Sequence, residues 1–276
     1  MTQPPLAECW PRPAVMGIVN VTPDSFSDGG DNVDPGVAIE TARRLLADGA
    51  ALVDIGGEST RPGADDVPLD EELRRVLPVV EGLGGKPVSI DTSKAEVARR
   101  ALALGACLVN DVTALRADPE LAGVVADAGA YLCLMHMQGE PRTMQAAPRY
   151  DDVVGEVCAF LEERLAVAVA AGIPEDRVCL DPGIGFGKTV AQNLALLNAL
   201  DRFCAIGRPV LVGVSRKSTL ARLLGDPDGR VGSEAASIGA AVAAFDRGAT
   251  LFRVHDVAAH VEALAIAAAI ERGAER

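Results

Sequence analysis

Short apolar segments alternate with longer helix-like segments along almost the whole chain. The apolar segments are rich in Val, Ile and Leu and are continuously apolar, which is typical of strands in a parallel sheet covered on both faces. They predict strands within residues 14–20, 51–57, 87–92, 107–112, 130–136, 177–183, 209–215 and 249–256. Segments rich in Ala, Leu, Glu and Arg predict helices near 35–49, 69–83, 93–105, 118–129, 151–172, 189–201, 233–248 and 256–272.

Eight strand–helix units in 276 residues match the count and length of an α/β protein of the (β/α)8 TIM barrel class. An open doubly wound sheet is the alternative, but the even succession of eight units favours the barrel. No linker-like, low-complexity or repeated segment divides the chain, so we expect a single domain over 1–276, with 1–12 as an irregular N-terminal extension. Long mobile loops are expected after the first and second strands.

Nearly every expected strand finishes in a polar residue. In a closed βα barrel the C-terminal ends of all strands ring one mouth, where active sites are built. Polar groups beside a packed barrel must find partners or cost about 1–3 kcal/mol each, so a full ring of them predicts a site. The residues are Asn20, Asp54, Asp91, Asn110, Asp111, His136, Asp181, Ser215, Arg253 and His255, with Glu58 beyond Asp54.

The formal net charge of −13 argues against nucleic acid or an anionic membrane surface as the main partner. No apolar run approaches the length of about 20 residues that spans a bilayer, and the N-terminus shows no signal-peptide pattern. Six scattered cysteines without a C-x-x-C pair predict a reduced, cytoplasmic protein.

The segment "DPGIGFGKT" (181–189) superficially resembles a phosphate-binding P-loop, but Pro182 stands where that motif needs glycine. What remains is a glycine-rich turn that begins at Asp181 and displays Phe186. Asp91 and Asp181 are either helix N-caps or ligand-binding carboxylates. Facing one cavity, they suit a ligand edge rich in N–H donors, such as a 2-aminopyrimidinone ring, to which Asn110 could both donate and accept.

Lys217, in "GVSRKSTLARLLG", is one of only four lysines in the chain. It could be a Schiff-base nucleophile, a cationic donor to a ligand, or a solvated surface residue. Ser218 is expected at the N-terminus of the next helix, which favours an anion. Arg253 and His255, two residues apart on the last strand, should point to the same side and could bind phosphate there.

Taken together, these segments resemble the dihydropteroate synthase family of folate biosynthesis. The similarity runs through "MGIVNVTPDSFSDGG", "GGESTRPGA", "SIDTSK", "VNDV", "LMH", "DPGIGFGK", "GVSRKS" and "RVHD", in the family's order. One mild departure is Ala221, where the family commonly has glycine. The resemblance implies a (β/α)8 barrel that uses Mg²⁺. Members of this family are usually homodimers and are targets of sulfonamides. The reaction that the resemblance implies joins (7,8-dihydropterin-6-yl)methyl diphosphate to 4-aminobenzoate, by dissociative loss of diphosphate and attack by the amine.

The resemblance also implies roles for residues of this chain. The pterin diphosphate would be bound by Thr60, Arg61, Asp91, Asn110, Val112, Met135, Asp181, Phe186, Gly213, Lys217, Arg253 and His255. The 4-aminobenzoate would be bound by Phe26, Pro62, Phe186 and Ser218. Catalysis would involve Asp28, Lys217 and Arg253. Asn20 would reach the magnesium ion.

Three alternatives remain open at this level. A pterin-binding methyltransferase barrel would keep the pterin-facing Asp and Asn set but has no use for both glycine-rich loops. An aldolase would form a Schiff base on Lys217. A catalytically silent paralogue would have lost a ligand residue, and none is lost here.

Overall fold

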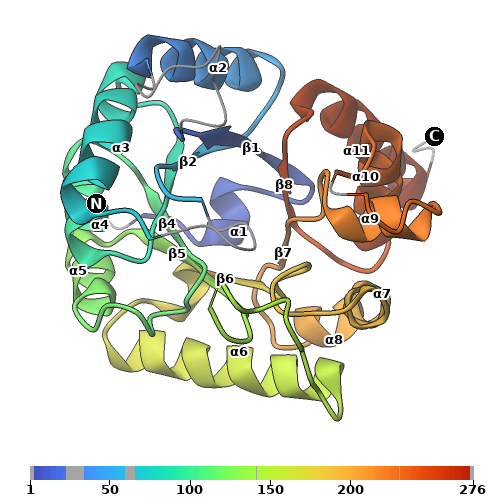
Figure 1. Cartoon of the computed structure of the whole chain (residues 1–276). Helices are drawn as coiled ribbons and strands as arrows, with labels where there is room; N and C mark the ends of the chain where they lie inside the picture. The colour runs from blue at the N-terminus through green and yellow to red at the C-terminus, as the bar shows by residue number, and fades with distance from the viewer. Residues whose placement is uncertain (1–2, 23–33, 60–65, 141, 230, 274–276) are drawn as a thin grey trace.

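Eight parallel strands, surrounded by helices, form a barrel in this computed structural model (Figure 1). The structure describes residues 3–22, 34–59, 66–140, 142–229 and 231–273. The strands are β1 (Ala14–Asn20), β2 (Leu52–Gly56), β3 (Val88–Asp91), β4 (Leu108–Asp111), β5 (Tyr131–Met135), β6 (Val178–Asp181), β7 (Leu211–Val212) and β8 (Leu251–Val254). Each lies within the segment that the apolar pattern predicted.

The strand order is β6-β5-β4-β3-β2-β1-β8-β7, so each strand neighbours its successor in the sequence except at the junction of β6 and β7. That junction is made by a single parallel bridge between Leu180 and Val210 and by a hydrogen bond from Leu180 N to Pro209 O at 2.9 Å. The barrel is therefore nearly closed. The predicted TIM barrel is confirmed, and the open doubly wound sheet is not what forms.

The helices that follow β1 fall where the sequence predicted them, with α8 and α9 in addition. They are α2 (Pro35–Ala47), α3 (Leu69–Leu83), α4 (Ala95–Ala103), α5 (Leu121–Ala128), α6 (Val153–Ala170), α7 (Val190–Asn198), α8 (Leu200–Cys204), α9 (Ser218–Leu223), α10 (Glu234–Phe245) and α11 (Val257–Arg272). The expected helix near 189–201 is divided into α7 and α8, and the short α9 precedes α10. No helix in the described ranges is long and apolar enough to cross a membrane.

Alternate residues of each strand face two different cores. Outward-facing residues such as Val53 and Ile90 pack against the helices in the larger core. Inward-facing residues such as Met16, Leu52 and Leu108 fill the N-terminal half of the barrel interior. Because the interior is filled from that end, the polar residues at the C-terminal strand ends sit on a packed floor.

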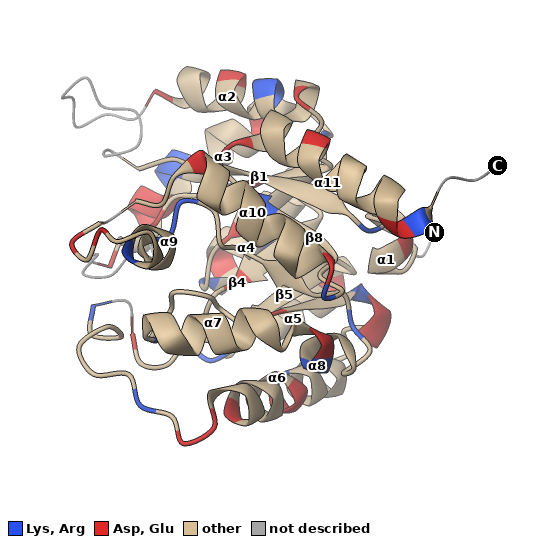
Figure 2. Cartoon of the chain, turned by 90° about the vertical axis from the view of Figure 1, so that its right-hand side faces the viewer, with Lys and Arg blue, Asp and Glu red and all other residues tan. Residues whose placement is uncertain are grey.

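The expected irregular extension contains a short helix, α1 (Leu6–Cys9), which lies over the middle of the barrel in Figure 1 and at one end of the barrel in Figure 2. Leu6 and Trp10 are buried with Met16 in the interior core. The rings of Trp10 and Tyr131 meet edge to face, with centroids 4.9 Å apart, and Tyr131 Oη donates to Pro4 O at 2.8 Å. The segment is thus partly helical where the sequence predicted an irregular one. The physical reason is that the apolar residues at this end of the barrel interior are removed from water by packing against Leu6 and Trp10.

Candidate active site

An ion-paired cluster lies at the C-terminal ends of β2, β3, β4 and β8. Arg253 Nε donates to Asp54 Oδ2 at 2.6 Å, and Arg253 Nη2 donates to Asp91 Oδ2 at 2.8 Å. Asn110 Nδ2 also donates to Asp54 Oδ2, at 3.0 Å. Strand alternation explains the meeting, because all four residues face the barrel interior and Asp91 is the register partner of Asn110.

This cluster decides between the two roles left open for Asp91. The N-cap position of α4 is Lys94, whose backbone N–H donates to Thr92 Oγ1, so Asp91 does not cap the helix. Burial raises the pKa of Asp91, whereas the ion pair with Arg253 opposes that shift and favours the carboxylate. The two bonds that Arg253 makes here leave up to three of its five N–H groups for a ligand.

Asp181 lies across the mouth, at the end of β6. Its Oδ1 accepts a hydrogen bond from Gly183 N at 2.7 Å, which orients the carboxylate at the start of the glycine-rich segment. Thr189 caps α7 with a full capping box, so Asp181 is not needed there. Burial raises the pKa of Asp181, and the nearby Lys217 counteracts part of that shift.

Lys217 reaches this part of the mouth from the N-terminal end of α9. Its Nζ donates to Ile184 O and lies 4.4 Å from the centroid of the Phe186 ring, a cation–π distance. Burial lowers the pKa of Lys217 to about 8, against the opposing effect of Asp181. The solvated-surface alternative for Lys217 is therefore wrong. Ser218 is the first residue of the six-residue α9, as expected.

A small apolar cluster forms one wall of the mouth. Val112, Met135 and Phe186 pack together there. Met137 and Met144 complete the wall, and the sequence analysis missed both because they lie in irregular segments without a periodic pattern. Such a wall suits the flat face of an aromatic ring.

Arg253 and His255 have different partners. Arg253 lies on β8 and turns inward to the carboxylates, whereas His255 follows the strand in a bend, and its Nδ1 lies 3.1 Å from Ser215 Oγ. The expectation that both residues point to the same side assumed that the strand continues to His255. Because β8 ends at Val254, strand alternation does not apply to His255.

Two further predicted residues, Gly213 and Asn20, lie at the ends of strands beside the mouth. Gly213 follows β7, and a Cβ added there would lie 3.9 Å from Arg253 Cβ, at the edge of the charged cluster. Asn20 ends β1, in register with Gly56, and by alternation from Met16 faces the mouth. Several of the expected residues, and with them the two expected mobile loops, lie outside the described residues: Phe26, Asp28, Thr60, Arg61 and Pro62.

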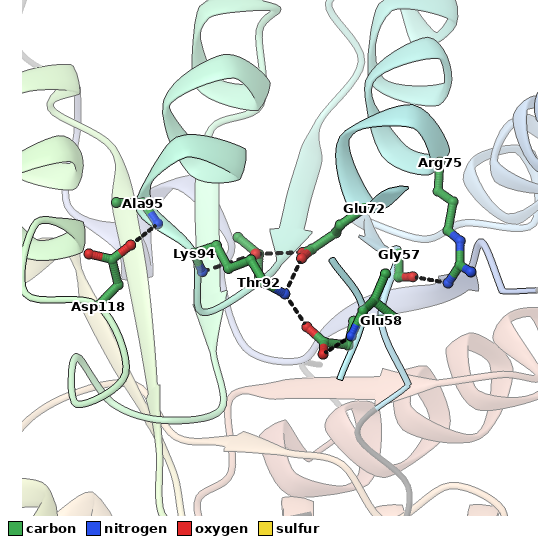
Figure 3. A network of polar contacts seen from close by, with 9 residues as sticks. Gly57, Glu58, Glu72, Arg75, Thr92, Lys94, Ala95 and Asp118 are labelled. Carbon is green, nitrogen blue, oxygen red and sulfur yellow. Dashed lines mark hydrogen bonds and ion pairs between the residues drawn. The ribbon is translucent and has the colours of Figure 1, made fainter. Parts of the chain in front are cut away.

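A charged network lies beside the mouth, between the C-terminal ends of β2 and β3 and the start of α3 (Figure 3). Lys94 Nζ lies 2.5 Å from Glu58 Oε2 and 2.6 Å from Glu72 Oε2, and Thr92 Oγ1 donates to Glu72 Oε1 at 2.6 Å. Glu58 Oε1 also accepts a bond from Val67 N at 2.9 Å. One carboxylate thereby ties the chain that leaves β2 to the chain that enters α3.

Asp54 is the most important residue to which the sequence analysis gave no role, although it was named among the polar strand ends. It is fully buried, and its Oδ1 has no hydrogen-bond partner among the described residues. The inward alternation from Leu52 could have placed it in the barrel. Its contact with Arg253 could not have been predicted, because 199 residues separate the two in the chain.

The fold and this site define the class. The family model described as "Pterin binding enzyme" matches residues 16–255, and the chain belongs to that family. Within it, the chain belongs with the dihydropteroate synthases. The dihydropteroate synthase of Escherichia coli K12 is 46% identical over 259 residues, which cover 92% of this chain and 90% of that protein.

Solved structures agree with this assignment. The Xanthomonas albilineans dihydropteroate synthase with 4-aminobenzoic acid has a TM-score of 0.87 and 51% identity, covering 95% of this chain and 94% of that one. The same enzyme with 7,8-dihydropteroate has a TM-score of 0.83 and 48% identity, covering 95% of each chain. The Yersinia pestis enzyme in a sulfonamide drug complex has a TM-score of 0.88 and 46% identity, again covering 95% of each chain. These matches favour the predicted family over the methyltransferase and aldolase alternatives.

Proposed function

We propose that this enzyme joins (7,8-dihydropterin-6-yl)methyl diphosphate to 4-aminobenzoate, giving 7,8-dihydropteroate and diphosphate. The observation that carries the proposal is the convergence of Asp91, Asn110, Asp181 and Lys217 on one barrel mouth beside an apolar wall. Relatives of nearly the same length are dihydropteroate synthases, and one solved relative holds 7,8-dihydropteroate.

The pterin ring would bind edge-on to the polar groups and flat against the wall. Its 2-amino and ring N–H groups are donors that match the carboxylates of Asp91 and Asp181. Asn110 can donate and accept at the same edge, and Lys217 can donate to a ring oxygen or nitrogen. Phe186 and Met135 would cover a ring face. This arrangement supports binding of the pterin in a fixed orientation, with its methylene group turned toward the mouth.

The leaving diphosphate needs positive charge. The N–H groups of Arg253 that remain after its bonds to Asp54 and Asp91 can supply some of it, and His255 stands nearby in the chain. Together with the N–H groups at the mouth, they would stabilise negative charge as the C–O bond breaks.

Magnesium is expected from the resemblance. The described residues fit a magnesium ion that binds together with the diphosphate, and do not form a separate metal site made of protein side chains alone. The described residues contain no group of three or more His, Cys, Asp or Glu side chains suited to a metal. A magnesium ion that arrives on a diphosphate needs only one or two protein ligands, because it keeps water and phosphate oxygens. Asn20 offers one amide oxygen at the mouth. When bound, Mg²⁺ would neutralise part of the diphosphate charge and make it a better leaving group.

The carbon–nitrogen bond would form by a dissociative route. Loss of diphosphate leaves a methylene cation delocalised into the electron-rich dihydropterin, so no protein nucleophile is required. The amine of 4-aminobenzoate then attacks the methylene carbon, and the proton that the new C–N product must lose passes to the released diphosphate or to water. Asp28 is proposed to stabilise the cation and to accept a hydrogen bond from the amine. Phe26, Pro62 and Ser218 are proposed to bind 4-aminobenzoate, and Thr60 and Arg61 to bind the diphosphate substrate.

The test is diphosphate release and dihydropteroate formation with both substrates and Mg²⁺. We expect wild-type turnover and a loss of at least a hundredfold in Asp181→Ala, because one pterin-binding carboxylate and the anchor of Gly183 disappear. The matched control is Asp176→Ala, an exposed aspartate just before the N-terminal end of β6, which should retain wild-type activity. Absence of dihydropteroate with the wild type would refute the proposal.

We further propose a cytoplasmic homodimer. Figure 2 shows that α10 and α11 present mostly uncharged residues on one side of the barrel. Ile266 and Ile270 on α11 are 59% and 75% exposed, and Leu224 beyond α9 is also largely exposed, which is typical of an interaction surface. Sedimentation of Ile270→Glu against wild type tests this, since the variant should be monomeric.

The six free cysteines support a reducing compartment.

A further inference from the structure

The glycine-rich segment after β6 is held by side chains along its whole length. Every backbone carbonyl from Gly183 to Gly187 accepts a hydrogen bond from a side chain of another part of the chain or from Lys188. Loop carbonyls are usually bound to water or to neighbouring backbone, so a loop this fully held is unusual. It has one shape rather than many.

Lys188 supplies more of these bonds than any other donor on the segment. Its Nζ lies 2.9 Å from Gly183 O and 3.0 Å from Phe186 O. The same nitrogen lies 2.9 Å from His136 Nδ1 and 3.3 Å from His136 O. Lys188 thus ties the segment after β6 to the residue that follows β5.

The lysine is in an environment that is costly for a charged group. Its exposed fraction is 2%, and burial lowers the pKa of Lys188 to about 7, although Asp181 opposes the shift. Burial also lowers the pKa of His136, to about 3, so that ring is neutral beside it. A buried amino group contributes little to stability compared with an apolar side chain of the same size. Its bonds therefore serve mainly to fix a conformation.

The backbone around Lys188 is closely packed against the segment that follows β5. Gly183 has φ +69°, and a Cβ added there would lie 1.9 Å from His136 O. Gly187 has φ +65°, and a Cβ there would lie 2.5 Å from Gln138 O. The segment is therefore pressed against residues 136–138, and Lys188 fills the space between them.

This segment places three groups of the pterin site. Gly183 N orients the Asp181 carboxylate, Phe186 forms part of the apolar wall, and Ile184 O accepts the bond from Lys217. We propose that Lys188 is a positioning residue for pterin recognition, holding the glycine-rich segment so that Asp181, Phe186 and Lys217 meet the ring together. The proposal rests on the proposed function and extends it to a residue that would not touch the substrate.

The experiment compares Lys188→Met with wild type in steady-state kinetics for each substrate. Methionine is likewise unbranched, is one atom shorter than lysine and has no hydrogen-bond donors. We expect the KM for the pterin diphosphate to rise about tenfold, the equivalent of one lost well-placed hydrogen bond, while the KM for 4-aminobenzoate stays within about twofold. The matched control is Lys86→Met, an exposed lysine before β3, which should match the wild type in both constants.

Two further measurements separate positioning from general stability. In hydrogen exchange, Lys188→Met should speed exchange at the amides of 183–187 and leave α11 unchanged. If Lys188→Met fails to fold, Gln145→Leu replaces it, because Gln145 is exposed and donates to Gly185 O at 2.6 Å. That variant should show the same selective rise in the pterin KM at about two- to threefold, consistent with the loss of one exposed hydrogen bond.

An unchanged pterin KM, or equal losses for both substrates with faster exchange throughout the barrel, would overturn the positioning role. Failure of the wild type to make dihydropteroate would instead refute the proposed function. The two failures are therefore distinguishable in one set of assays.

Discussion

Arg253 Nε and Asp54 Oδ2 lie 2.6 Å apart, and this bond joins the last strand of the barrel to the second. The same carboxylate oxygen accepts a bond from Asn110. Asp54 therefore sets the position of two residues expected to contact the pterin diphosphate, although it lies below them in the barrel interior. Ordered side chains of this kind fix the geometry of a site before the substrate arrives.

Asp54→Asn should weaken both the fold and the use of the pterin substrate. The change leaves the half-buried Arg253 with one carboxylate partner and removes a fully buried one, so the free energy of unfolding should fall by about 3 kcal/mol. Urea denaturation measures this. Glu40→Gln is the control, because its ion pair with Arg43 is exposed, and it should change stability by less than about 0.5 kcal/mol. Equal effects of the two variants would contradict the special position of Asp54.

Asn20→Ala and Asp28→Ala should affect different kinetic constants. Loss of the Asn20 amide oxygen should raise the KM for the pterin diphosphate about tenfold, and with it the magnesium concentration needed for half activity. Asp28→Ala should chiefly lower kcat, by about a hundredfold, if it stabilises the developing cation. Steady-state assays across a magnesium titration, with EDTA as the metal-free reference, measure both. Negligible effects from both would remove the first loop from the mechanism.

The activity should fall at high pH because Lys217 loses its proton. Burial lowers the pKa of Lys217 to about 8, so the donor form predominates below that pH and disappears above it. The value of kcat/KM for the pterin diphosphate should then fall by up to about tenfold per pH unit above 8. Lys217→Arg stays protonated throughout this range, so its descending limb should move beyond the range measured.

The control for this profile is Asp91, because burial raises its pKa toward the same range. Asp91→Asn should retain the descending limb if Lys217 causes it. A limb that persists in Lys217→Arg and vanishes in Asp91→Asn would assign the titration to Asp91 instead.

Lys94→Met should destabilise the enzyme through Glu72. Glu72 is fully buried, and Lys94 is its cationic partner at 2.6 Å. Removing the ammonium therefore leaves a buried carboxylate with Thr92 as its remaining hydrogen-bond partner among the described residues. The expected loss is about 3 kcal/mol in the free energy of unfolding. The double variant Lys94→Met with Glu72→Gln should recover part of this loss. A double variant as unstable as the sum of the single ones would show that the pair is not coupled.

The interior core also shows where the apolar pattern alone reaches its limit. The apolar pattern predicted the strands because a strand buried on both faces must be apolar throughout, and the structure confirms all eight predicted strands. It did not predict α1, because four helical residues have no period to detect. Leu6 and Trp10 form that cover only because the barrel floor presents Met16 and Leu52 to them.

The sequence by itself determined the barrel class, the ring of polar strand ends and the family, since strand burial, strand alternation and motif spacing are all local properties of the chain. Only the tertiary structure decided which polar residues meet. Asp54 joins Arg253, Lys94 joins Glu58 and Glu72, and Lys188 lies between His136 and the glycine-rich segment. The first of these contacts depends on the pairing of β8 with β1, and the others depend on how neighbouring strand–helix units pack. Each joins residues that are distant in the chain, and no local pattern records which of them meet.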